Sequence, residues 1–385
     1  MWFDVIIVGG GLAGLSLACA LRETRLKIAL VESHPPRPAE GWDARVYAVS
    51  PANAEFLKQI GAWRHLDADR LNPVHAMKVF GDSGAHLGFS AYEAGVDELA
   101  WILESAPLSC ELWETVRRQS NVTLFCPARP HSLSLDEGAT TLRLEDGHEL
   151  SAKLVVGADG RDSWVRGSAG LTATQTPYDE MGVVANFECE RPHRHTAWQR
   201  FRDDGVLAWL PLPGNRLSMV WSTPDMHAQE LTALSPDGLS SRVAAAGTHV
   251  LGNLNLITPP SAFPLCLMRV PKIVAPRIAL IGDAAHGIHP LSGHGINLGF
   301  RDAETLAGIL AQAPEWQDIG DERLLRRYQR ARREEIDLLQ YTTHTLRLLF
   351  REKLPGLKAV RNGGMALTDR LPIFKNLLVH YALGT

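Results

Sequence analysis

The sequence predicts an α/β fold of two lobes, in which a lobe of alternating strands and helices is interrupted by a β-rich antiparallel lobe and followed by a helical segment. Three hydrophobic runs that are each followed by glycine, at residues 5–8, 153–156 and 277–281, predict buried strands of the first lobe. Apolar and polar residues alternate over 77–92 and 178–270, which predicts the antiparallel strands. The length of 385 residues also exceeds the ~250 to 300 residues at which a single core stops growing.

The same patterns divide the chain. From Asp302 onward the pattern is helical, with a basic stretch at 326–333 and leucine-rich turns after it. We therefore expect the first lobe at 1–72, 97–176 and 270–335, the β-rich lobe at 73–96 and 177–269, and C-terminal helices at 336–385.

Composition indicates a folded globular protein and excludes some partners. Hydrophobic residues make up 45% and charged residues 21% of the chain, close to the averages of such proteins. The formal net charge of −4 provides no basic field for nucleic acid. The five cysteines are scattered and form no C-x-x-C pair, which is typical of reduced thiols in a cytoplasm. No run approaches the ~20 apolar residues of a membrane-spanning helix, and Asp4 interrupts the first run, which argues against a signal peptide.

The first strand leads into a glycine-rich turn that predicts a dinucleotide site. Gly9-x-Gly11-x-x-Gly14 opens a helix expected over 12–25, and Glu32 ends the next strand eighteen positions after Gly14. These glycines permit the tight turn, the approach of backbone amides to a pyrophosphate, and close packing of helix on strand. Glu32 offers oxygens to ribose hydroxyls and would repel a 2′-phosphate. The pattern predicts a Rossmann-type lobe with these cofactor-binding residues: Gly9, Gly11, Leu12, Ala13, Gly14 and Glu32.

Two further segments place polar residues after the second and third hydrophobic runs. Asp159 and Gly160 follow the second run, and Gly282 and Asp283 follow the third. A loop with proline and glycine then leads into a helix near residue 295, whose free amides favour negative charge. The amides at Gly295, Ile296 and Asn297 are therefore expected to face an anionic ligand, whereas Asp159 with Gly160 alone is also a common turn.

The histidines of this loop raise the question of a metal. His286, His289 and His294 match no compact ligand spacing, and Asp283 is the one obvious carboxylate partner. We therefore expect no metal site.

Taken in order, the three motifs resemble those of the class A flavin-dependent monooxygenases, which are similar to para-hydroxybenzoate hydroxylase. The resemblance is closest to their ubiquinone-biosynthesis hydroxylase branch. It extends to residues 207–212 and 220–222 in the β-rich lobe and to 361–364 and 369–372 near the end.

This resemblance implies that the cofactor is FAD. It also implies these cofactor-binding residues in the second and third motifs: Asp159, Gly160, Gly282, Asp283, Pro290, Gly293, Gly295, Ile296 and Asn297. Asp283 would contact the ribityl chain, and the helix start near 295 would face the pyrimidine side of the isoalloxazine. The segment of Asp159 would lie beside both FAD and the visiting nicotinamide. Arg45 is similar to the family's arginine near the FAD phosphates, and the alternative is an ordinary surface arginine.

The sequence departs from the family pattern in three places. Residues 104–109 lack the asparagine, arginine and glutamine that relatives often have, so side-chain contacts to FAD are not carried over there. Ser292 and His294 stand where relatives commonly have alanine and glutamine. Arg161 and Asp162 replace a small residue and asparagine, so the choice between NADH and NADPH stays open.

The implied activity is hydroxylation with NAD(P)H or another reductant and dioxygen. In the family, reduced FAD and dioxygen give a C4a-hydroperoxide, whose distal oxygen passes to an electron-rich phenolic ring. The protein must supply a dry pocket and hold one ring carbon near the flavin. A group that takes the phenol proton would make the ring more nucleophilic, and His294 is the catalytic candidate.

A polyprenylated phenol, the substrate that the branch implies, would need an apolar channel. Trp198, Trp209 and Trp221 could line it, although aromatic residues at alternating strand positions are more often core. The leucine-rich tail at 346–350 and 373–378 could contact the inner membrane or another quinone-biosynthesis protein, but packing on its own lobe is the simpler expectation. We expect a cytoplasmic protein, with peripheral membrane contact and the oligomeric state left open.

Other functions stay open at this point. A related enzyme could hydroxylate a small soluble aromatic compound, and a non-catalytic protein could bind FAD as a scaffold of a biosynthetic complex. A flavin-dependent halogenase is disfavoured because the sequence has no Trp-x-Trp-x-Ile-Pro segment and no lysine near the first motif. A reductase of prenyl chains would share the first motif but would not consume dioxygen.

Overall fold

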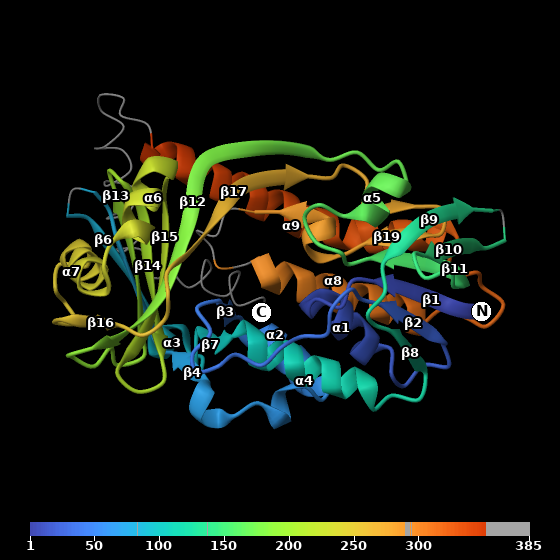
Figure 1. Cartoon of the computed structure of the whole chain (residues 1–385), viewed down its shortest axis with the longest axis horizontal. Coiled ribbons are helices and arrows are strands. Elements are labelled where there is room, and N and C mark those ends of the chain that lie inside the picture. The colour runs from blue at the N-terminus through green and yellow to red at the C-terminus, as the bar shows by residue number, and fades with distance from the viewer. Residues whose placement is uncertain (83, 137, 289–292, 294, 352–385) are drawn as a thin grey trace.

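The computed structural model describes residues 1–82, 84–136, 138–288, 293 and 295–351. Figure 1 shows two lobes, a parallel sheet with helices at the right and a β-rich lobe at the left. The predicted α/β architecture, in which a β-rich lobe interrupts a dinucleotide-binding lobe, is confirmed.

The sheet of the first lobe has eight strands, and its central ones are parallel. Val5 to Val8 are at most 3% exposed, as expected for a strand covered on both faces. The main path of the sheet, in spatial order, is β18 (Val274–Ala275), β19 (Ile278–Leu280), β11 (Glu149–Gly157), β1 (Trp2–Val8), β2 (Ile28–Val31) and β8 (Val122–Phe125). The strands β9 (Pro130–Leu135) and β10 (Thr140–Leu144) extend it beside β11.

The first helix is shorter than the sequence predicts. We expected it over 12–25, but α1 (Leu12–Ala20) ends at Ala20. The hydroxyl of Thr24 donates to the Leu21 carbonyl at 2.6 Å, and such side-chain bonds compete with continuation of a helix. The other helices of this lobe are α2 (Pro51–Gln59), α4 (Ser105–Arg117), α5 (Trp164–Ser168) and α8 (Gly295–Ala311).

The β-rich lobe is built on a sheet of nine strands. Its main path runs through β20 (His286–Gly287), β17 (Ser261–Arg269), β12 (Thr174–Cys189), β15 (Arg216–Pro224), β14 (Gly205–Leu212), β13 (Thr196–Arg202), β5 (Ala76–Phe80) and β6 (His86–Ser90), and β16 (Leu254–Leu256) pairs with β12. All pairs are antiparallel except β5 with β13, which is parallel. A parallel pair needs a long connection, and the segment of the first lobe from β7 to α5 lies between these two strands in the chain.

Two helices interrupt the stretch that alternation predicted to be all strand. The prediction was wrong at α6 (Asp225–Ala233) and α7 (Pro236–Ala246). The start of α7 carries a recognisable signal, because the Ser235 hydroxyl accepts the Gly238 amide at 3.2 Å and proline follows it. Both helices cover one face of the nine-stranded sheet (Figure 1).

Trp198, Trp209 and Trp221 lie in the core beneath these helices. They are at most 7% exposed and pack with residues of α6 and α7. The structure thus supports the alternative that these tryptophans are core residues. Their side chains point toward α6 and α7 and not toward the first lobe.

A small sheet joins the lobes. It consists of β3 (Val46–Val49), β7 (Ala100–Glu104) and β4 (Asn72–Val74). Ala48 and Ile102 of this sheet share an apolar cluster with Ala197 and Leu212 of the β-rich lobe. The short helix α3 (Ala91–Ala94) and the 3₁₀ turns η1 (Trp63–His65), η2 (Ala68–Arg70) and η3 (Gly282–Ala284) complete the connections.

The last described helix, α9 (Glu322–Arg351), runs without a break across the expected boundary at 335/336. Its far half reaches β12, where the Arg347 guanidinium pairs with Glu180 at 3.0 Å. Among the helices of the described ranges, none has the length and apolar character to cross a membrane. Residues 352–385 of the expected C-terminal helices lie outside the described residues.

Gly247 tests the packing of α7 on the sheet. An added Cβ would lie 1.7 Å from Cη2 of Trp209, so we expect Gly247→Ala to lower the free energy of unfolding by about 1–3 kcal/mol. Thermal melting measures this. Gly308→Ala in α8 is the control, because no atom lies within 4 Å of its added Cβ and alanine favours a helix. Equal melting temperatures for Gly247→Ala and the wild type would contradict the packing.

Candidate functional site

All three motifs lie at one edge of the parallel sheet. The strands β1, β2, β11 and β19 are neighbours that run in the same direction, so their carboxyl ends meet at this edge. Gly9, Glu32, Asp159 and Asp283 follow those four ends. In open α/β sheets, ligands bind outside the carboxyl ends of the strands. The structure therefore brings the predicted segments together.

The glycines of the first motif differ in what surrounds them. A Cβ on Gly9, whose φ is +108°, would lie 2.4 Å from the Ala158 carbonyl oxygen, and a Cβ on Gly14 would lie 2.1 Å from the Gly9 carbonyl oxygen. A Cβ on Gly11 would meet nothing within 4 Å. Gly9 and Gly14 are therefore required by packing, whereas Gly11 borders open space at the start of α1, where orphan amides attract an anion.

The carboxylate of Glu32 already accepts hydrogen bonds from neighbouring residues of the protein. Its Oε2 accepts the Gly10 amide at 2.5 Å, and its Oε1 accepts the Ser33 hydroxyl at 2.9 Å and the His34 amide at 3.0 Å. A carboxylate has about four acceptor positions. One therefore remains for a ligand hydroxyl.

A surface pocket of about 280 Å³ adjoins Glu32. Its lining combines the turn after β2, the turn after β8 and the β10–β11 hairpin, and consists of Ser33, His34, Pro127, Ala128, Arg129, Glu145 and Asp146. The Ala128 amide donates to the Glu32 carbonyl at 2.8 Å, which fixes the two turns side by side. The sequence analysis did not predict these residues. A signal was available, because the turn after β8 follows the carboxyl end of a strand that neighbours β2.

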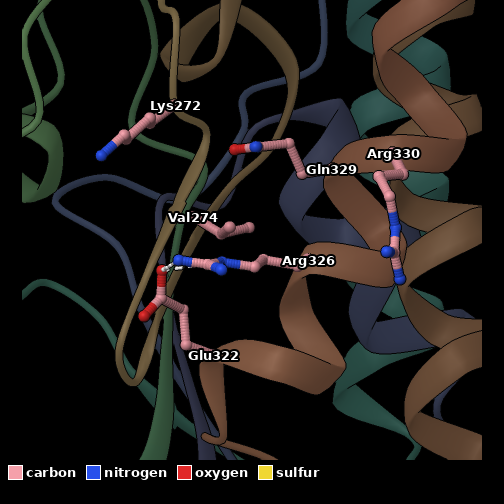
Figure 2. Close-up of a pocket in the computed structure, with 6 residues that line it drawn as sticks. All are labelled: Lys272, Val274, Glu322, Arg326, Gln329 and Arg330. Atoms are coloured by element: carbon pink, nitrogen blue, oxygen red, sulfur yellow. Dashed lines mark hydrogen bonds and ion pairs between the residues drawn. The ribbon is translucent and has the colours of Figure 1, made fainter.

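A second pocket, shown in Figure 2, lies away from the motifs. It measures about 260 Å³ and lies between the β18 region and the start of α9. Its lining residues are Lys272, Val274, Glu322, Arg326, Gln329 and Arg330. Arg326 pairs with Glu322 at 2.8 Å. None of the predicted site residues lines this pocket.

The second motif builds a turn. Asp159 accepts the Ser163 hydroxyl at 2.5 Å and the Val165 amide at 3.0 Å, and Gly160 has a φ of +83°. The side chain of Asp159 therefore organises the start of α5. Arg166, which the sequence analysis did not single out, is 7% exposed and donates to the Ala284 carbonyl at 3.0 Å. That bond ties the second motif to the third.

The third motif presents one exposed carboxylate. Asp283 is exposed, whereas Gly282 and Ala284 beside it are buried. Gly282 has a φ of +60° and packs close to the methyl group of Ala13. Asp283 is thus held at the surface of the sheet edge, next to the start of α1.

Tyr47 connects Asp283 with Arg45. The pKa of Tyr47 is raised, first by burial and then by the charges of Asp283 and Asp43, against the opposing effect of Arg45. The Arg45 guanidinium lies 5.7 Å from the centre of the Tyr47 ring and is exposed. Arg45 is therefore an exposed cation beside Tyr47, a side chain that also senses the charge of Asp283.

Glu104, which directly precedes the departure from the family pattern at Ser105 and Ala106, holds the loop that carries Arg45. Its carboxylate is fully buried and accepts two bonds from Arg70 at 2.7 Å and the Asp43 amide at 2.6 Å. Asp43 in turn accepts the Arg45 amide at 2.9 Å. The role of Glu104 is to fix this loop.

Asn297 uses its side chain inside the protein. Its Oδ1 accepts from Ser50 and Asn53 at 2.9 Å, and its Nδ2 donates to the carbonyls of Ala48 at 2.8 Å and Gly293 at 3.2 Å. A cofactor contact from Asn297 can therefore involve only its backbone. Gly295, Ile296 and Asn297 begin α8 as expected. Pro290 and His294 lie outside the described residues.

The buried carboxylate of Asp302 was missed by sequence reasoning. It is 0% exposed and accepts the Gly282 amide at 2.9 Å, a bond from His286 at 2.6 Å and a bond from Arg332 at 2.7 Å. Burial alone would raise its pKa, but His286 and Arg332 outweigh burial and the pKa of Asp302 lies below its ordinary value. His286 uses its Nε2 atom in this contact. In the described part of the chain, no group of three His, Cys, Asp or Glu side chains could hold a metal.

Asp302→Asn tests this network. It removes one of the two carboxylates that pair with the buried Arg332, and Glu335 is the other, so we expect a loss of about 1.5–3 kcal/mol of stability at pH 7, the contribution of a hydrogen bond between charged groups. Because the folded pKa is depressed, the ionised carboxylate stabilises the protein above the usual carboxyl pKa of about 4, and this contribution disappears as pH falls through the folded pKa. The difference in melting temperature between variant and wild type should therefore shrink from pH 7 toward acid. A difference that is independent of pH would contradict the assignment.

Comparisons with known proteins agree with this geometry. The model of the FAD binding domain family matches residues 3–339. The 3-demethoxyubiquinol 3-hydroxylase of Escherichia coli is 32% identical over 387 positions, covering 99% of this chain and 98% of that protein. Ubiquinone hydroxylase UbiL of Rhodospirillum rubrum is 34% identical over 385 positions, covering 99% and 90%.

A solved structure shows the same fold. The p-nitrophenol 4-monooxygenase PnpA of Pseudomonas putida aligns with a TM-score of 0.80 at 20% sequence identity, covering 99% of this chain and 98% of that one. The chain therefore belongs to the FAD binding domain family, in the ubiquinone-biosynthesis hydroxylase branch of the class A FAD-dependent monooxygenases.

Proposed function

We propose that this FAD-dependent monooxygenase hydroxylates the ring of a polyprenylated phenol or quinol intermediate in ubiquinone biosynthesis. Two relatives that match over nearly the whole chain are named as hydroxylases of ubiquinone or of its demethoxy precursor. The observation that carries the proposal is that three motif segments, far apart in the sequence, meet at one edge of the parallel sheet beside the β-rich lobe (Figure 1).

The side chains and turns at this edge suit FAD. Gly11 leaves open the space that a pyrophosphate would fill, and Glu32 keeps an acceptor for a ribose hydroxyl. The pocket beside Glu32 suits the adenine. Asp283 is exposed toward the polar ribityl chain, and Arg45 is free to meet a phosphate.

The protein and its cofactor have separate tasks. When bound and reduced by NAD(P)H, FAD supplies the activation of dioxygen and the delivery of one oxygen atom to the ring. The two lobes exclude water from the space between them and hold the ring. We keep His294 as the proposed acceptor of the phenol proton.

The polyprenyl chain of the proposed substrate determines where the enzyme can encounter it. Such a chain partitions into lipid, since each buried methylene favours transfer out of water. We propose that the enzyme meets its substrate at the face of a membrane or receives it from another protein of the pathway.

Gly11→Ala tests the cofactor site. Because the added methyl group contacts no protein atom, the apoprotein should melt at the wild-type temperature. The methyl group would, however, enter the space of the pyrophosphate, so we expect FAD affinity to fall by about tenfold or more. Flavin fluorescence titration measures the affinity, and Gly308→Ala is the control for a glycine with equally open surroundings. Unchanged affinity would contradict the placement of the pyrophosphate.

The activity is tested with the purified holoenzyme, NADH or NADPH, and 2-prenylphenol. We expect substrate-dependent oxygen consumption and a product heavier by one oxygen atom in mass spectrometry. A deletion strain should accumulate a polyprenyl intermediate that disappears when the gene is restored. Unchanged quinone pools with turnover of small phenols would instead identify a hydroxylase of soluble aromatics. Flavin that no donor reduces would identify a non-catalytic scaffold.

A further inference from the structure

One face of the nine-stranded sheet is turned toward the first lobe. Successive side chains of a strand point to opposite faces. Trp198 of β13 lies in the core with α6 and α7. Its neighbour Ala197 lies on the other face, in an apolar cluster with Ala48 and Ile102 of the small sheet. Gln199, two residues after Ala197, shares this second face.

Gln199 stands in a row of apolar residues on that face. Direct cross-strand pairing joins Val184 to Val220, Val220 to Ala208, Ala208 to Gln199, and Gln199 to Val79. Ala208 and Val220 are half-buried although they lie on central strands. The row is therefore not sealed by the first lobe, and the small Ala208 leaves room directly beside Gln199.

The carboxamide of Gln199 lacks a partner. The residue is 8% exposed, yet no residue in the described ranges forms a hydrogen bond with its side chain. The amide atoms are not among the fully buried polar atoms without a partner, so the amide keeps access to the space beside the sheet, although side chains buried to this extent normally form hydrogen bonds. The buried amides of Asn186 on β12 and Gln340 on α9 both donate to carbonyl groups at 2.8 Å, although Oδ1 of Asn186 has no partner. Gln199 thus carries unused hydrogen-bonding capacity on an open apolar face.

This face adjoins the third motif. Ala48, which shares the cluster of Ala197, accepts a hydrogen bond from Asn297 at 2.8 Å and lies beside Gly293. Gln199 is one strand repeat beyond Ala197, about 6 to 7 Å along β13. A ring held near the flavin-binding motif would therefore lie within reach of Gln199.

The geometry points to Gln199 as a specificity-determining residue that hydrogen-bonds an oxygen substituent of the substrate ring, while Val184, Val220 and Ala208 contact the apolar part. A carboxamide both donates and accepts, so it suits a phenol hydroxyl and a methoxy or quinone oxygen alike. A site that bonds a substrate hydroxyl discriminates against an analogue without it, because the buried polar group is then left unpaired. This inference rests on the proposed function, since it assumes an oxygenated aromatic substrate.

The test compares two probes that differ by one hydroxyl group, 2-prenylphenol and prenylbenzene, in wild-type holoenzyme and in Gln199→Met. Their dissociation constants follow from the change in flavin absorbance on binding. We expect the wild type to prefer the phenol by roughly fivefold to tenfold, the effect of one or two hydrogen bonds. The variant should lose this preference and bind prenylbenzene at least as well as the wild type. Gln175→Met, the same change at an exposed site of β12, should keep the wild-type ratio.

Two further measurements keep the outcome interpretable. FAD content and melting temperature of Gln199→Met should equal those of the wild type, since the amide forms no hydrogen bond with the described part of the protein and methionine has a similar volume. Gln199→Glu removes the N–H donors but keeps the acceptor, so it should still bind 2-prenylphenol and lose affinity for 2-prenylanisole. An unchanged phenol preference in Gln199→Met would overturn the inference. If neither probe perturbs the flavin of the wild type, the proposed function has failed instead.

Discussion

The contact between the ends of β1 and β11 is the constraint on which the site depends. At Gly9 the two strands approach so closely that a Cβ would lie 2.4 Å from the Ala158 carbonyl oxygen, and α1 is held equally close through Gly14. Only glycine permits this approach. The first and second motifs touch at this point, and Ala13 of α1 packs against Gly282 of the third motif. These backbone contacts alone bring all three motifs together.

The second constraint couples this edge to the β-rich lobe. Asp302 holds the Gly282 amide and His286 with one buried carboxylate, and Arg332 fixes it from α9. His286 begins β20, which pairs with β17 in the nine-stranded sheet. The loop with Asp283 is therefore anchored to both lobes, so a change in their relative position would move the exposed carboxylate that we propose for FAD.

Features that are local in the sequence were predictable. The turn at Gly9 and the strand ends before Glu32, Asp159 and Asp283 follow from short motifs, and a parallel sheet aligns such ends. The helices α6 and α7 were missed because a period of two was extended over them, although Ser235 followed by Pro236 marked a helix start.

Roles that depend on distant partners were not predictable. Asn297 was expected to offer a backbone amide to the cofactor, and no local pattern indicated that its side chain accepts a hydrogen bond from Ser50, 247 positions away. In the sequence, Asp302 has the spacing of an ordinary polar residue on an amphipathic helix. Only the folded structure shows that its carboxylate is buried between Arg332 and His286. Gln199 stands beside Trp198 and Arg200 in the sequence, and only cross-strand pairing with Ala208 and Val79 shows that it lies on the face toward the first lobe.

The most direct test of the convergence of the three motifs is a titration of the purified apoprotein with FAD. We predict uptake of one equivalent, a yellow protein with a perturbed flavin spectrum, and no comparable uptake of NADPH at the same site, because Glu32 repels a 2′-phosphate. A colourless protein that takes up no FAD would contradict the central claim.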